Sequence, residues 1–259
     1  MECKNCLKSL RTDYSFCPNC GAKIIRNRIT FNNLWHDVTE RYFNWDNSFL
    51  KTIRDMVLQP ETVCSSYILG QRKKYLNPIS LLAITLTLSG FLLFVLKKIA
   101  WEELDFSSLS YGQNANQLKE MSSQTMEYSS FLTLSYIPIL AVAGFLFFNK
   151  KNYNLPEHMV IGMYSLGTFT ILSFPYSIIT LIVAPQFYLD FALQYVLLMI
   201  LFCTYISYRN SKYSLKEIIW RGPLYLLIFF FGYIGISILQ FVVLLLTGTI
   251  GIADFAPQN

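Results

Sequence analysis

The chain has 259 residues, of which 53% are hydrophobic and 14% are charged, and its formal net charge is +5. Soluble proteins carry about 25% charged residues, so this composition excludes an ordinary soluble globular protein. The apolar residues form long runs rather than repeating at the period of a surface helix or strand, which is typical of segments that satisfy their backbone within lipid. We therefore predict an α-helical membrane protein.

Residues 1–25 contain four cysteines in two Cys-x-x-Cys pairs, Cys3 with Cys6 and Cys17 with Cys20. Two such pairs can supply four thiolates to one tetrahedral Zn²⁺ and leave no coordination position open for chemistry. The segment has too few apolar residues to fold without metal. A redox dithiol, the alternative, would need one pair on a thioredoxin-like unit, and the sequence predicts no such unit. We therefore predict a small N-terminal zinc ribbon with a structural Zn²⁺.

Residues 26–77 are expected to form amphipathic cytoplasmic helices. One long helix or two in tandem are predicted over 30–59, and a short helix is predicted to begin near Pro60 and end before Gly70. An aromatic and aliphatic stripe follows helical spacing on one face. Its members are Phe31, Leu34, Trp35, Val38, Tyr42, Trp45, Phe49, Ile53 and Met56.

This stripe has two interpretations. In the first, it packs against the transmembrane helices or against a homo-oligomeric neighbour. In the second, it lies in the plane of the bilayer surface, with Trp35, Trp45 and Phe49 at the level of the lipid headgroups. The polar face carries both signs of charge, which favours the first interpretation.

Residues 78–252 contain about five apolar segments, each long enough to cross a hydrocarbon core of about 30 Å. The predicted spans are 79–96, 131–148, 159–184, 191–208 and 224–250. A short tail over 253–259 follows them.

The distribution of cations predicts the orientation of these spans. If the N-terminus is cytoplasmic, 18 of the 21 Lys and Arg residues lie on the inner side, as the positive-inside rule requires. Arg72, Lys73 and Lys74 directly precede the first span and, with Tyr75, are predicted at the membrane interface. No apolar signal segment is evident in the first 25 residues, so we expect the cysteines in the reducing cytoplasm. An odd number of spans leaves the C-terminus outside.

Catalytic signals are weak in this sequence. Ion-coupled transporters and membrane hydrolases keep ionisable residues within the bilayer, and the predicted spans contain almost none. The sequence has no Gly-x-Ser-x-Gly, His-Glu-x-x-His or P-loop motif. Cys64 and Cys203 are expected to pack as small hydrophobic residues. We therefore expect no enzymatic activity.

Several motifs resemble one uncharacterised bacterial family. They are Cys3-Lys-Asn-Cys6, Cys17-Pro-Asn-Cys20-Gly21, Arg28-Ile29-Thr30, Gln59-Pro60-Glu61 and the stretch from Gly70 to Pro78. The family consists of multi-pass inner-membrane proteins with a zinc ribbon, known only as a domain of unknown function. It favours Gly-Lys-Arg where this chain has Gly70-Gln71-Arg72. The resemblance implies a fold and an inner-membrane location, and it implies no activity.

The sequence favours a non-catalytic inner-membrane adaptor whose zinc ribbon docks a protein partner. The first alternative is a transporter or lipid-handling protein, because the Gly, Pro and Ser residues of the 159–184 segment are typical of a helix kinked around a cavity. The second alternative is binding of nucleic acid by the ribbon. The cations that would carry it are Lys4, Lys8, Arg11, Lys23, Arg26 and Arg28. The positive-inside bias already accounts for those charges, which disfavours nucleic acid as a partner.

Overall fold

The computed structural model describes residues 2–3, 5–21, 24, 48–104, 122–123 and 129–246. The chain divides into two compact units, Met1–Asp46 and Asn47–Asn259, which we call the head and the membrane unit. The described part of the head contains turns and an isolated antiparallel β-bridge between Glu2 and Ser9. Trp35, Trp45 and the predicted tail lie outside the described residues.

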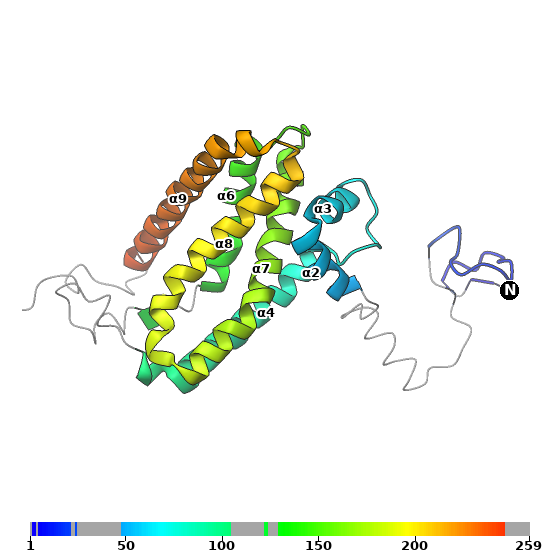
Figure 1. Ribbon diagram of the computed structural model, residues 1–259. Coiled ribbons are helices and arrows are strands. Elements are labelled where there is room, and N and C mark those ends of the chain that lie inside the picture. The colour runs from blue at the N-terminus through cyan, green and yellow to red at the C-terminus, as the bar shows by residue number, and fades with distance from the viewer. Residues whose placement is uncertain are drawn as a thin grey trace, which may run out of the picture. The chain divides into compact units, whose positions relative to one another are not determined.

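The described part of the membrane unit is helical, as predicted (Figure 1). Its α-helices are α2 (Ser48–Leu58), α3 (Pro60–Ile68), α4 (Pro78–Val95), α6 (Ser129–Phe147), α7 (Leu155–Val183), α8 (Tyr188–Ser211) and α9 (Leu215–Leu246). Short turns of helix follow α4, as η2 (Leu96–Ala100) and η3 (Trp101–Glu103), and precede α8, as η5 (Pro185–Phe187). Helix α7 contacts α4, α6 and α8, while α9 packs on α6 and α8. Helix α7 therefore lies at the centre of the packing within the unit.

Each of the five predicted spans corresponds to a helix, but the number of spans shown is smaller. Among the described residues, the segments Pro78–Ile99, Leu155–Val183 and Leu215–Val243 are long and apolar enough to cross a membrane. A fourth span results if Pro185–Ala192 and Gln194–Ser211, which meet at a bend of 40°, act together. The described apolar part of α6 is shorter than these segments. The structure therefore supports a membrane protein with three such helices, or four with the bent pair.

Of the helices predicted before the first span, the structure describes α2, at the end of the predicted 30–59 region, and the short helix α3, while residues 30–47 lie outside the described residues. Gln59 separates the two helices, and Pro60 occupies the first turn of α3. Gly70 follows the end of α3 with a φ of 91°. Both helices pack on the N-terminal half of α7, where Met56 and Val63 are fully buried in one cluster with Tyr164. The segment from α2 to residue 77 thus belongs to the same compact unit as the membrane helices.

Hydrogen bonds fix the start of α4 against this packing. The Tyr164 hydroxyl donates to the carbonyl of Leu76 at 2.7 Å, and the Leu76 amide donates to Thr52 Oγ1 at 2.9 Å. The side chain of Asn77 then accepts from the Ile79 amide and caps α4. Because buried backbone groups are costly when left without partners, these bonds hold α2, α4 and α7 in one register.

Glycines allow two of the helix pairs to approach closely. A Cβ on Gly167 of α7 would lie 2.9 Å from Leu81 Cγ in α4, and a Cβ on Gly232 of α9 would lie 2.6 Å from Ile139 Cγ2 in α6. Small residues at such crossings are typical of helices that associate in membranes, where contact between the helices replaces the hydrophobic effect.

Candidate functional site

The four head cysteines come together as the sequence predicts. Their Sγ atoms all lie within 4.8 Å of one another, with Cys3 3.7 Å from Cys20 and Cys6 3.6 Å from Cys17. A tetrahedral zinc with Zn–S bonds of about 2.3 Å requires sulfur atoms about 3.8 Å apart. The donor set therefore fits a tetrahedral metal ion such as Zn²⁺, bound by four thiolates with no position left for substrate.

The two cysteine pairs share one backbone conformation. The Leu7 amide donates to the carbonyl of Cys3 at 2.8 Å, and the Gly21 amide donates to the carbonyl of Cys17 at the same distance. Leu7 and Gly21 both have positive φ, 60° and 70°. Each pair is therefore closed by the same left-handed turn, which glycine adopts without strain and leucine does not. Glycine at position 21 is the residue type that favours this turn, whereas leucine at position 7 gives no sign of it.

The local environment shifts the pKa values of two of the thiols in opposite directions. The backbone amide of Lys8 hydrogen-bonds Cys6 and lowers its pKa. The backbone amide of Cys20 acts in the same direction on Cys17, but burial and the neighbouring thiols outweigh it and raise the pKa of Cys17 to about 11. Four thiolates in this space repel one another, and a bound cation removes that repulsion.

Two of the residues predicted at the membrane interface pack inside the membrane unit. Phe49, on α2, lies partly buried against the cluster that contains Met56 and Tyr164. Tyr75 is only 5% exposed and packs within the membrane unit, and its predicted place at the membrane interface stays a prediction. The turn before α4 lays the ring over α2, where the Tyr75 hydroxyl donates to Asp55 Oδ2 at 3.0 Å.

Charge and burial oppose each other at this contact. Partial burial acts to raise the pKa of Asp55, but hydrogen bonds from Arg54 and Tyr75 outweigh it and lower that pKa. Burial, assisted by the Asp55 carboxylate, raises the pKa of Tyr75 to about 12. At neutral pH the pair therefore consists of a carboxylate and a protonated phenol, the states that form a charge-assisted hydrogen bond.

The other predicted interface residues that the structure describes are exposed cations. Arg72, Lys73 and Lys74 lie in the connection that directly precedes α4 and its candidate span. The guanidinium of Arg72 lies over the ring of Tyr67, and Lys74 lies over the ring of Tyr75. Their placement at a membrane surface remains a prediction.

Other cations gather at the same end of the membrane unit. Arg209, near the end of α8, donates to Glu61 Oε1 of α3 at 2.8 Å and to the carbonyl of Leu58 at 3.2 Å. Arg221, near the start of α9, donates to the carbonyl of Phe147 at 2.8 Å. Lys151 lies close enough to Lys212 that burial and this neighbour lower its pKa. The connections after α6 and α8 thus share a basic end with α2 and α3.

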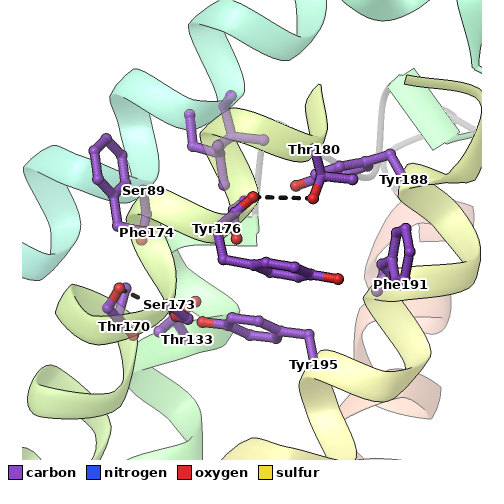
Figure 2. Close-up of a pocket in the computed structure, with 14 residues that line it drawn as sticks. Ser89, Thr133, Thr170, Ser173, Phe174, Tyr176, Thr180, Tyr188, Phe191 and Tyr195 are labelled. Atoms are coloured by element: carbon purple, nitrogen blue, oxygen red, sulfur yellow. Dashed lines mark hydrogen bonds between the residues drawn. The ribbon is translucent and has the colours of Figure 1, made fainter. Parts of the chain in front are cut away.

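A cavity of about 250 Å³ lies toward the opposite ends of α7 and α8, with walls that also include α4 and α6 (Figure 2). Six of its lining residues carry hydroxyl groups on short side chains: Ser89, Thr133, Thr170, Ser173, Ser177 and Thr180. Five are aromatic: Phe174, Tyr176, Tyr188, Phe191 and Tyr195. Leucine and alanine complete the walls, so none of the described residues that line the cavity carries a charge. Sequence reasoning anticipated a kinked α7 beside a cavity, but not the tyrosines of α8.

Comparison with protein families matches residues 46–90 to a protein of unknown function (DUF3667). This segment comprises α2, α3, the basic connection and most of α4, and it includes the stretch from Pro60 to Pro78. Comparisons with curated proteins and with solved structures found no match. The chain is therefore similar to an uncharacterised family over the part of the membrane unit where α2 and α3 join the first candidate span.

Proposed function

We propose that this protein is a non-catalytic adaptor of the bacterial inner membrane whose zinc-bound head docks a protein partner. The observation that carries the proposal is the four-cysteine cluster, in which all Sγ atoms lie within 4.8 Å. A tetrahedral ion with four protein ligands has no open position for a substrate or an activated water. Its remaining contribution is to give a short segment a fixed surface.

The surface of the head supports a docking role. Leu7 and Phe16 are 75% and 53% exposed, although each directly adjoins a metal-ligand cysteine. Large apolar side chains held in fixed positions on a small polar domain are suited to contact another protein. Zinc would hold both side chains in place by fixing Cys6 and Cys17.

In the proposed arrangement the membrane unit has five spans, with the N-terminus in the cytoplasm and the C-terminus outside. The support is the basic end formed by the α6–α7 and α8–α9 connections together with α2 and α3. A cytoplasmic position for this end follows the positive-inside rule. Arg72, Lys73 and Lys74 would then meet the inner headgroups just before α4.

The adaptor function is tested by quantitative co-purification from native membranes. Three proteins are compared: the intact chain, the Cys17→Ser/Cys20→Ser variant and the Phe16→Ser variant. We expect the cysteine variant to lose both zinc and partner, and Phe16→Ser to keep zinc and lose partner. Ser237→Ala, on an exposed position of α9, serves as the control that changes neither. An identical protein profile for all four, or unchanged zinc in the cysteine variant, would contradict the proposal.

Lipid handling by the membrane helices is a second candidate, and the uncharged cavity favours it over ion-coupled transport. Nucleic-acid binding by the head ranks third. It predicts a complex that forms at low salt and weakens steeply as salt rises. The absence of a shifted band at low salt in an electrophoretic assay would remove it.

A further inference from the structure

The cavity between α4, α6, α7 and α8 presents hydrogen-bond acceptors. Thr170 donates its hydroxyl proton to the carbonyl of Leu166 at 3.0 Å, and Ser173 donates to that of Phe169 at 2.8 Å. Thr180 donates to the carbonyl of Tyr176 at 2.9 Å. A hydroxyl has one proton and two lone pairs, so each of these oxygens retains the capacity to accept. The α7 wall therefore favours a ligand that brings its own O–H donors.

The α8 wall supplies phenol groups that donate as well as accept. Figure 2 shows Tyr195 directing its hydroxyl toward Ser173 and Thr133, and Tyr188 extending toward Thr180. Tyr176 lies edge-to-face with Phe191 at a centroid distance of 5.8 Å. The cavity thus combines hydroxyl groups with aromatic faces, which together suit a small hydroxylated group with C–H surfaces between its oxygens.

The cavity favours an uncharged ligand, because its described lining residues carry no charged side chain. No carboxylate and no Lys or Arg side chain occurs among the described lining residues. A phosphate headgroup would lose its hydration without gaining a cation, and an ammonium group would lose its hydration without gaining an anion. Cation–π contact with the rings compensates an ammonium only in part. An uncharged group is therefore the best match.

The size and the opening of the cavity indicate that the ligand extends beyond it. Its volume of about 250 Å³ is below the range of roughly 300 to 1,000 Å³ that is typical of pockets for whole ligands. Tyr176 lines the cavity and is also 52% exposed, so the wall opens to the outside at this residue. The residues that continue the same exposed face of α7 are Leu172, Ile179 and Val183. Because α7 is a candidate span, this apolar face lies where acyl chains would be.

We propose that the cavity binds the uncharged, hydroxyl-bearing headgroup of a membrane glycerolipid of the mono- or diacylglycerol class. The headgroup donates to the Ser and Thr oxygens of α7 and meets the tyrosines of α8. The acyl chain leaves beside Tyr176 and lies along the exposed face of α7. The proposal deepens the lipid-handling candidate and is independent of docking by the head, which co-purification tests separately.

The test is photolabelling of the full-length protein in lipid nanodiscs with a diacylglycerol that carries a diazirine in one acyl chain. We expect the label on α7 and α8, located by peptide mass spectrometry. Excess monoacylglycerol should compete, whereas phosphatidic acid and a long-chain alkylammonium should not. Competition by either charged amphiphile as strong as that by monoacylglycerol, or a label spread evenly over the exposed helices, would overturn the proposal.

Two variants sharpen this result. Ser173→Phe fills the cavity and should reduce specific labelling at least tenfold, while Ser237→Phe, the same change on the exposed face of α9, should leave it unchanged. If Ser173→Phe does not accumulate as folded protein, Tyr195→Phe decides, because it removes one hydroxyl and keeps the ring. The loss of one hydrogen bond predicts a reduction of about fivefold. Full labelling of Tyr195→Phe and of any folded Ser173→Phe would refute the assignment.

Discussion

Among the described residues of the head, the buried cluster consists of Cys3, Leu10 and Cys17, whereas one cluster of the membrane unit alone includes Met56 and Tyr164, both fully buried. Two of these three described residues belong to the four-cysteine cluster that fits a metal ion. Apolar burial contributes about 25 cal/mol per Å², so a cluster of this size cannot offset the conformational entropy of ordering the segment. We therefore expect the head to obtain its stability from a bound metal ion, whereas the membrane unit obtains it from packing and internal hydrogen bonds.

Removal of the expected zinc ion should produce the largest difference in stability between the two units. A high-affinity chelator is expected to unfold the head, because structural zinc contributes about 10–16 kcal/mol in small metal-dependent domains. The helices of the membrane unit should remain, since no described residue of that unit belongs to the cysteine cluster. Hydrogen exchange read by mass spectrometry would report loss of protection over residues 5–21 and unchanged protection over 48–104. Persistent protection of the metal-free head would show that zinc is not its main source of order.

Packing should be the corresponding weak point of the membrane unit. Gly232→Ala places a Cβ 2.6 Å from Ile139 Cγ2, and we expect the resulting overpacking to destabilise the unit by about 1–3 kcal/mol. Gly235→Ala is the matched control on the same helix, because its Cβ would have no neighbour within 4 Å. Thermal unfolding in detergent, followed by circular dichroism, measures both. Equal melting temperatures for the two variants would mean that α6 and α9 do not pack as closely as described.

The ion pair between Arg209 of α8 and Glu61 of α3 tests whether the helices before the first span are stabilised by the membrane helices. Arg209 and Glu61 are 2.8 Å apart with side chains 33% and 35% exposed. Because the pair is partly buried, it should stabilise the unit more than an exposed ion pair does. We therefore expect Arg209→Ala to lower the free energy of unfolding by about 1–2 kcal/mol. A double-mutant cycle with Glu61→Ala isolates the coupling between the two side chains.

The matched comparison for this cycle is Lys150 with Glu217, whose charged atoms are 4.0 Å apart and whose lysine side chain is 53% exposed. We expect its coupling energy to be close to zero. A coupling for Arg209 and Glu61 no larger than that of Lys150 and Glu217 would indicate that α3 is held by its apolar face alone.

The sequence was most informative where a local pattern determines the structure. The spacing of the cysteines predicts their cluster, and Pro60 and Gly70 mark helix boundaries that the structure confirms. It was less informative where the structure depends on contacts between distant segments. Tyrosine is a residue type that is common at membrane interfaces. Tyr75 is buried because the chain before α4 folds back over α2.

The cavity illustrates the same limit. The Ser and Pro residues of α7 are visible in the sequence, but its partner residues Tyr188 and Tyr195 lie on α8 among ordinary apolar neighbours. Nothing in their local spacing distinguishes them from aromatic residues that face lipid. Their role follows from the crossing of α7 and α8, which a helical period alone does not specify.

The contact between Asp55 and Tyr75 gives the smallest expected effect and places a pH limit on the packing of α2. Because the pKa of Asp55 is lowered from 3.8 in the folded state, its contribution is complete above the ordinary value and is lost as pH falls through the lowered value. Because the pKa of Tyr75 is raised to about 12, its contribution is complete below 10 and is lost as pH rises toward 12. Hydrogen exchange of α2 as a function of pH should therefore show protection that declines at both ends. Asp55→Asn should remove most of the decline in protection at acid pH and lower the free energy of unfolding by about 1 kcal/mol at neutral pH. Tyr75→Phe should reduce the decline in protection at both acid and alkaline pH. A decline at acid pH that persists in Asp55→Asn would assign the decline to other carboxylates and leave α2 held by Met56 and its apolar neighbours.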